Sequence, residues 1–269
     1  MSVLSMSELT TFRWSFEEDV AHFKKAGYKA LGVWRQKLAD YGEAKGVELL
    51  EESGLTCSNL LWCGGFTGSD GRGFRDGLDD ARDAVQTAAA LRAGCLIVYT
   101  GARGGHTRNH ARRLLADALK ELVPVAAEHN VVLALKPMHP EASGELTFLT
   151  DVADAVALAD SFADPHLKLV FDTYHLGIAP NWEAKLRAVA PHLAMVHLAD
   201  GLAPNDGEQS RTRLGQGTVP LKEILAALDD AGYDGYYDVE LVGTDVDPTG
   251  YPDLLEHSRE AFRNFTGAC

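Results

Sequence analysis

The chain has 269 residues, of which 46% are hydrophobic and 24% are charged, as in an ordinary folded soluble protein. The formal net charge of −14 argues against binding to a nucleic-acid backbone, which requires a basic face. A small anionic ligand is not excluded, because it needs only a local cation. The length suits two small domains or one α/β barrel of roughly 250 residues.

Targeting signals and cysteine spacing bear on location. The first ten residues, MSVLSMSELT, lack a basic region followed by an apolar core, so no export signal is evident. No apolar run approaches the ~20 residues of a membrane helix. The four cysteines show no CxxC spacing, which fits reduced thiols. We therefore expect a cytoplasmic protein without a membrane partner, and a homo-oligomer is left open.

Eight short apolar runs are typical of parallel strands that are covered on both faces. In chain order they span residues 3–6, 29–34, 57–62, 95–100, 131–136, 168–172, 193–198 and 236–241. Helical patterns alternate with them, opening at Ser15 and then spanning residues 80–91, 107–128, 150–159, 182–189, 221–231 and 252–265. No linker interrupts the series, which predicts one (β/α)8 TIM barrel over residues 1–269. An open doubly wound sheet would need a glycine-rich turn after the first strand, where SMSELTTF has none.

Ionisable residues gather where the last four predicted strands end, which is the face that carries the site in a barrel. These residues are Lys136, Asp172, His197 and Glu240, one from each strand. The last three are donor types that bind Mn²⁺, Mg²⁺, Co²⁺ or Zn²⁺. Buried hydrogen-bond networks use the same residue types, so spacing alone leaves a metal site and a structural network equally open.

Four stretches, VFDTYHLG, MVHLADG, LGQGTVPLKEIL and YYDVELVG, resemble in this order the sugar phosphate isomerase/epimerase family. This is a group of xylose-isomerase-like barrels in the AP endonuclease 2 superfamily. The resemblance implies a divalent metal held by Glu, Asp, His and Glu from strands five to eight. Asp172, His197 and Glu240 match three of these ligands. Lys136 stands where the family has the first Glu, which in the epimerases is also an acid/base group.

Three roles for Lys136 are open. A metal could remain on the other three residues, with the lysine as a neutral amine that acts as a base or a fourth ligand. Alternatively, the ammonium replaces the metal, pairs with Asp172 and Glu240 and polarises a substrate oxygen, which we favour slightly. Third, the site could bind a sugar without catalysis.

The resemblance implies isomerisation or epimerisation of a sugar or keto-polyol through proton abstraction beside a carbonyl and an enediolate. We expect Glu240 to be the base and Lys136 its electrostatic partner or proton donor. A lyase that dehydrates a keto-cyclitol such as an inosose is the rival, and a non-catalytic sugar-binding protein is the rival of another class. An endonuclease IV-like activity is disfavoured by the missing histidines and the acidic charge.

Five further residues are candidates for contact with the substrate. The resemblance places a substrate-binding histidine at His175 and an arginine at Arg213, although Arg211 lies two residues away and either could be a surface charge. His139 follows Lys136 and either lines the mouth or caps its loop. Trp34 and Trp62 could form an apolar wall against a sugar ring, or belong to the core.

Overall fold

The computed structural model describes residues 2–141, 144, 146–202, 210–242 and 250–267. All eight predicted strands are present. They are β1 (Val3–Ser7), β2 (Ala30–Trp34), β3 (Thr56–Gly64), β4 (Leu96–Tyr99), β5 (Leu133–Leu135), β6 (Leu167–Asp172), β7 (Leu193–Leu198) and β10 (Tyr236–Val239). They pair in parallel and close in the order β1-β10-β7-β6-β5-β4-β3-β2. The predicted (β/α)8 barrel is therefore confirmed.

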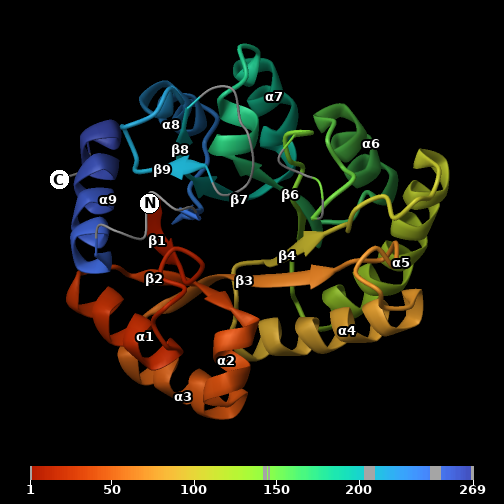
Figure 1. Ribbon diagram of the computed structural model, residues 1–269, viewed down its shortest axis with the longest axis horizontal. Coiled ribbons are helices and arrows are strands. Elements are labelled where there is room, and N and C mark those ends of the chain that lie inside the picture. The colour runs from red at the N-terminus through yellow and green to blue at the C-terminus, as the bar shows by residue number, and fades with distance from the viewer. Residues whose placement is uncertain (1, 142–143, 145, 203–209, 243–249, 268–269) are drawn as a thin grey trace.

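Helices surround these strands, as Figure 1 shows. They are α1 (Phe16–Lys25), α2 (Arg35–Tyr41), α3 (Glu43–Ser53), α4 (Phe74–Ala90), α5 (Arg108–Glu128), α6 (Val152–Phe162), α7 (Trp182–Val189), α8 (Leu221–Asp230) and α9 (Tyr251–Thr266). Ser15 caps α1 in a capping box with Glu18, which explains why the helix starts there. Among the described helices, none combines the length and apolar character needed to cross a bilayer.

The structure differs from the prediction in three places. Helix α4 begins at Phe74 rather than at residue 80, and α2 and α3 were not predicted. A small antiparallel hairpin, β8 (Asp200–Gly201) with β9 (Arg211–Thr212), was also not predicted. Its strands have two residues each, too few to show the alternation that marks a strand.

Apolar side chains fill the barrel in two layers. The larger layer lies between strands and helices, and a smaller cluster includes Leu61, Ile97, Val170 and Met195. The described cysteines, at positions 57, 63 and 95, are free and buried. Above the smaller cluster, Asp172 at the end of β6 pairs in register with His197 of β7. This register places ligand-type side chains at one level of the barrel mouth.

Candidate functional site

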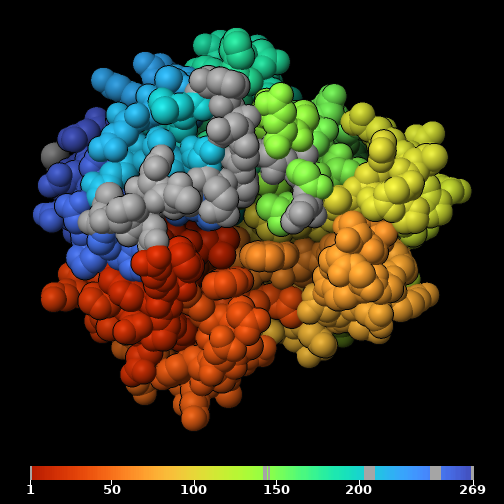
Figure 2. All heavy atoms as spheres, viewed as in Figure 1, coloured from red at the N-terminus to blue at the C-terminus, as the bar shows by residue number. Residues whose placement is uncertain are grey.

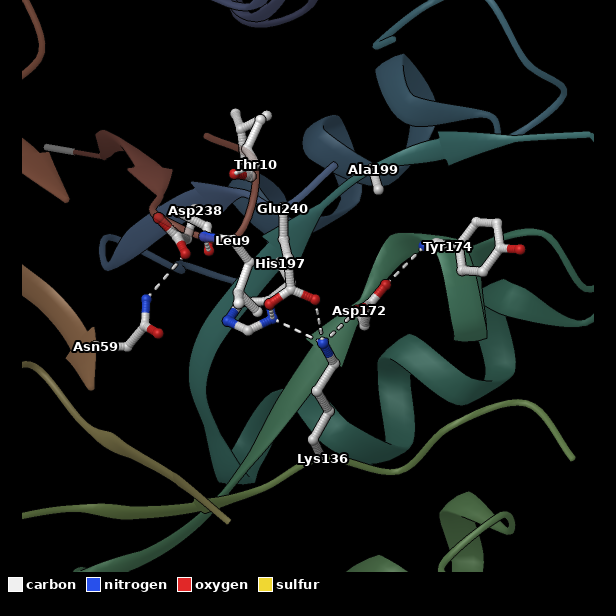
Figure 3. A network of polar contacts seen from close by, with 12 residues as sticks. Leu9, Thr10, Asn59, Lys136, Asp172, Tyr174, His197, Ala199, Asp238 and Glu240 are labelled. Carbon is white, nitrogen blue, oxygen red and sulfur yellow. Dashed lines mark hydrogen bonds and ion pairs between the residues drawn. The ribbon is translucent and has the colours of Figure 1, made fainter. Parts of the chain in front are cut away.

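Lys136 lies at the centre of the barrel mouth and is fully buried. Its Nζ donates hydrogen bonds to Glu240 Oε1 at 2.6 Å and His197 Nδ1 at 3.0 Å, and it forms an ion pair with Asp172 Oδ2 at 2.8 Å. Figure 3 shows the three acceptors converging on this one nitrogen. An ammonium has three N–H donors, and one protein atom from each of three side chains lies within 3.0 Å of this nitrogen. The charge that ends the fifth strand is thus paired within the site.

Arg211 on β9 is a second buried cation, and sequence reasoning did not select it. Its guanidinium donates to both oxygens of Asp172, at 3.3 and 3.1 Å, and its Nη2 lies 3.3 Å from Glu240 Oε1. The same Nη2 lies 3.1 Å from His175 Nε2, and the guanidinium carbon lies 4.8 Å from the Tyr174 ring centre. Arg211 therefore joins the predicted residues into one group. We call Lys136, Asp172, His197, Arg211 and Glu240 the mouth cluster.

Two cations and two carboxylates balance each other in the mouth cluster. Burial alone lowers the pKa of Lys136, but Asp172 and Glu240 outweigh burial, and the pKa lies above the usual lysine value. Burial raises the pKa of both carboxyls, yet the cations, Arg211 first at Asp172 and Lys136 first at Glu240, hold both pKa values well below their usual range. All four groups are therefore charged at neutral pH.

Asp172, His197 and Glu240 form a candidate metal-binding triad, because one donor atom from each lies within 4.8 Å of the others. A metal would need to sit about 2.0–2.2 Å from such donors. Lys136 Nζ already lies between the same three side chains, and Arg211 adds a second positive charge. Together with these two cations, the three donors do not fit a divalent metal.

The chain that follows β6 orients Asp172 and His175. Asp172 Oδ1 accepts hydrogen bonds from the backbone N–H groups of Tyr174 and His175, at 2.9 and 3.3 Å. These bonds cap a π-helical turn, Thr173–Gly177, a rare conformation that is often found at functional sites. The turn directs His175 toward Arg211. The predicted substrate histidine therefore lies at the mouth cluster, fully buried.

The structure pairs Arg213 with Asp253 of α9 at 2.7 Å, where 67% of the Asp253 side chain is exposed. His139 is half-buried, and its Nδ1 accepts a hydrogen bond from the backbone N–H of Glu141 at 3.4 Å. Burial lowers the pKa of His139. Trp34 and Trp62 are half-buried against the smaller apolar cluster. Their roles in substrate binding stay predictions.

Trp62 also lines a cleft beside the mouth cluster. The cleft has a volume of about 610 Å³ and lies at the ends of β3 and β4. Tyr99 forms part of its wall and packs edge-on against Trp62, with ring centres 5.5 Å apart. The Tyr99 ring centre lies 5.8 Å from Lys136 Nζ. The cleft is therefore next to the buried ammonium.

Comparisons with known proteins agree with this architecture. A fructoselysine 3-epimerase from Shigella flexneri is 30% identical over 175 residues, which cover 62% of this chain and 59% of that protein. The chain thus spans less than two thirds of this relative. Protein SMc04130 from Sinorhizobium meliloti 1021 shares 26% identity and a TM-score of 0.90 over 97% of each chain. An IOLI protein with a bound zinc atom has the same fold, with a TM-score of 0.86 at 18% identity over 98% of each chain.

The family model described as xylose isomerase-like TIM barrel matches residues 20–264. The match covers every strand after β1 and ends within the last helix. It includes Lys136 and all other members of the mouth cluster. The chain therefore belongs to the xylose isomerase-like TIM barrel family.

Proposed function

We propose that this protein isomerises or epimerises a keto sugar by moving a proton beside the carbonyl, with the Lys136 ammonium in place of a divalent metal. The observation that carries the proposal is the position of Nζ, 2.6–3.0 Å from one donor atom of each residue of the candidate metal-binding triad. The family and the similarity to a fructoselysine 3-epimerase support a sugar as the substrate.

The ammonium can serve the reaction by binding the oxygen that becomes negatively charged in the enediolate. Three side chains already surround Nζ at 2.6–3.0 Å, so the substrate oxygen must replace one of them. His197 is the partner that costs least to replace, because the other two are carboxylates that balance the charge of the ammonium. Lys136 would then keep both ion pairs and gain the substrate.

Glu240 is the base in this proposal. Its Oε1 is held by Lys136, and its Oε2 lies 3.1 Å from His197 Nδ1. A substrate oxygen that displaces His197 would lie beside Oε2, the oxygen of Glu240 that Lys136 does not hold. Arg211 keeps the position of Asp172 and Glu240 during this exchange.

Proton exchange with solvent tests the proposal. Chelator-treated protein is incubated in D₂O with a panel of keto sugars, and deuterium is located by NMR. We expect uptake at the carbon beside the carbonyl, lost in Glu240→Gln and kept in Glu223→Gln, which changes an exposed residue of α8. Binding without uptake on any ketone would instead indicate a sugar-binding protein. Formation of a dehydrated product would indicate the lyase.

A further inference from the structure

Glycine backbone forms part of the lining of the cleft beside Tyr99. Gly64, Gly65 and Gly101 line it, and all three have positive φ, at 131°, 79° and 83°. A Cβ at Gly64 would lie 1.7 Å from the carbonyl oxygen of Tyr99, so only glycine fits there. A Cβ at Gly65 would lie 2.6 Å from Asp70 Oδ2 and one at Gly101 would lie 2.9 Å from Thr67 Oγ1, so the three glycines let the segments after β3 and β4 pack closely and shape this side of the cleft.

Aromatic and apolar side chains form the walls. Trp62 is half-exposed, Tyr99 packs edge-on against it, and Leu146 lies on the segment after β5. In Figure 2 the orange segment after β3 and the yellow segment after β4 lie side by side on this face. A hydrogen bond from Thr67 Oγ1 to the Ala102 carbonyl, at 2.5 Å, joins these segments. Such walls suit the face of a ring.

The charges of the described residues that line the cleft are a poor match for a phosphate. Among the described residues that line it, Arg72 is the one cationic side chain. Its Nε donates to Asp70 at 2.8 Å, its Nη1 to Asp80 at 3.0 Å and its Nη2 to the Gly64 carbonyl at 3.1 Å. A phosphate in the cleft would also face the Asp70 carboxylate. Phosphate sites normally provide free guanidinium or ammonium donors.

Together these features define the ligand by its chemistry. We infer that the cleft holds an uncharged ring attached to the reacting sugar, so that the substrate is a keto sugar with a glycosidic substituent and not a sugar phosphate. The inference rests on the proposed function for the place of the reacting carbonyl, at Lys136. Tyr99 is shared by the two places, because it lines the cleft and its ring centre lies 5.8 Å from Nζ, so we place the substituent of a sugar held at Nζ in the cleft.

Binding of unreactive probes tests this inference apart from catalysis. Dissociation constants are measured calorimetrically for phenyl β-D-glucopyranoside, D-glucose and glucose 6-phosphate. We expect the phenyl glucoside to bind roughly tenfold more tightly than glucose, as a stacked ring would contribute. Trp62→Ala should remove this preference, while Trp62→Phe should keep it. Trp182→Ala, on α7 outside the cleft, is the matched control and should also keep it.

A change of charge in the cleft provides a second test of the inference. Asp70→Asn removes one partner of Arg72, and both side chains are about 40% exposed, at 38% and 41%, so we expect the variant to fold. It should bind glucose 6-phosphate more tightly than the parent does. The inference is wrong if the parent prefers glucose 6-phosphate to the phenyl glucoside, or if the preference for the glucoside survives Trp62→Ala. Loss of deuterium exchange with the glucoside preference intact would overturn the proposed function alone.

Discussion

Two buried lysines of this barrel have surroundings that differ in charge. Lys136 donates hydrogen bonds to Glu240 and His197 and forms an ion pair with Asp172 in the mouth cluster. Lys37 donates to the carbonyls of Glu8 and Thr11, at 3.1 and 2.9 Å, and to Asp19 Oδ2 at 2.5 Å. We call Glu8, Thr11, Asp19 and Lys37 the α1–α2 cluster. Both clusters are buried, and each contains two carboxyl groups. The mouth cluster contains two cations, whereas the α1–α2 cluster contains one.

Because of this difference in charge, the pKa values of the carboxyl groups shift in opposite directions in the two clusters. In the α1–α2 cluster, burial is the main cause that raises the pKa of Asp19 to about 6 and that of Glu8 well above its usual value. In the mouth cluster, the second cation, Arg211, helps to hold both carboxyl pKa values low. A buried lysine alone therefore does not predict ionised neighbours; the balance of charges does.

Replacement of the central lysine should give the largest difference in stability between the two clusters. Lys136→Met leaves two buried carboxylates with one cation, and we expect it to lower the free energy of unfolding by about 3–5 kcal/mol at pH 7. Lys37→Met is the matched change, and its cost should shrink at pH 5 because Glu8 and Asp19 can bind protons. Urea unfolding at pH 5 and 8 measures both. Equal pH dependence in the two variants would contradict the comparison.

Conversion of the lysine to a carboxylate should create a metal site. Lys136→Glu removes one of the two cations and adds a fourth donor to Asp172, His197 and Glu240, so its affinity for Mn²⁺ should exceed that of the parent. At 100 times the dissociation constant, bound metal would stabilise the variant by about 2.7 kcal/mol. Thermal melts with and without Mn²⁺ measure the shift. If the variant binds metal no better than the parent, Lys136 does not occupy the missing ligand position.

The contribution of the α1–α2 cluster to the free energy of unfolding should fall as the pH rises. The folded-state pKa of Asp19 is raised, so its contribution is present below the unfolded pKa of about 4 and lost as pH rises through about 6. Relative to Asp19→Asn, the parent should lose about 2–3 kcal/mol between pH 4 and 7. The exposed Asp117→Asn should show no such trend. A parent that gains stability over Asp19→Asn in this range would refute the assignment.

The smallest effect is expected at Arg213. Its ion pair with the largely exposed Asp253 is worth up to about 1 kcal/mol, so Arg213→Gln should change stability little. Arg211→Gln should cost much more, because Asp172 and Glu240 lose a buried cation. Unfolding and sugar binding are compared in the two variants. Loss of sugar binding in Arg213→Gln alone would support the sequence-based assignment of Arg213 to the substrate.

The strands were predictable because each is a short apolar run between helical patterns. Helices α2 and α3 were not, because Trp34 and Gly42 precede them without a side-chain cap. Lys136, Asp172, His197 and Glu240 were predictable as a group because each lies at the end of a strand. Their register in a closed barrel then brings them together.

Arg211 could not be chosen over Arg213 from the sequence. Both precede the same Gly-Gln-Gly stretch, and they are separated by one residue. The choice depends on the β8–β9 hairpin, in which Gly201 pairs with Arg211, and on the pairing of Arg213 with α9. These are tertiary contacts. The charge balance of the mouth cluster depends on Arg211, so it could not be predicted from the sequence either.

Metal content, measured together with exchange, tests most directly whether the ammonium replaces the metal. Protein is purified without added metal, its metal content is determined by mass spectrometry, and deuterium uptake into a reactive keto sugar is followed before and after treatment with chelator. We predict substoichiometric metal and an exchange rate that chelator does not change. Stoichiometric metal, together with exchange that chelator abolishes and metal restores, would contradict the role assigned to Lys136.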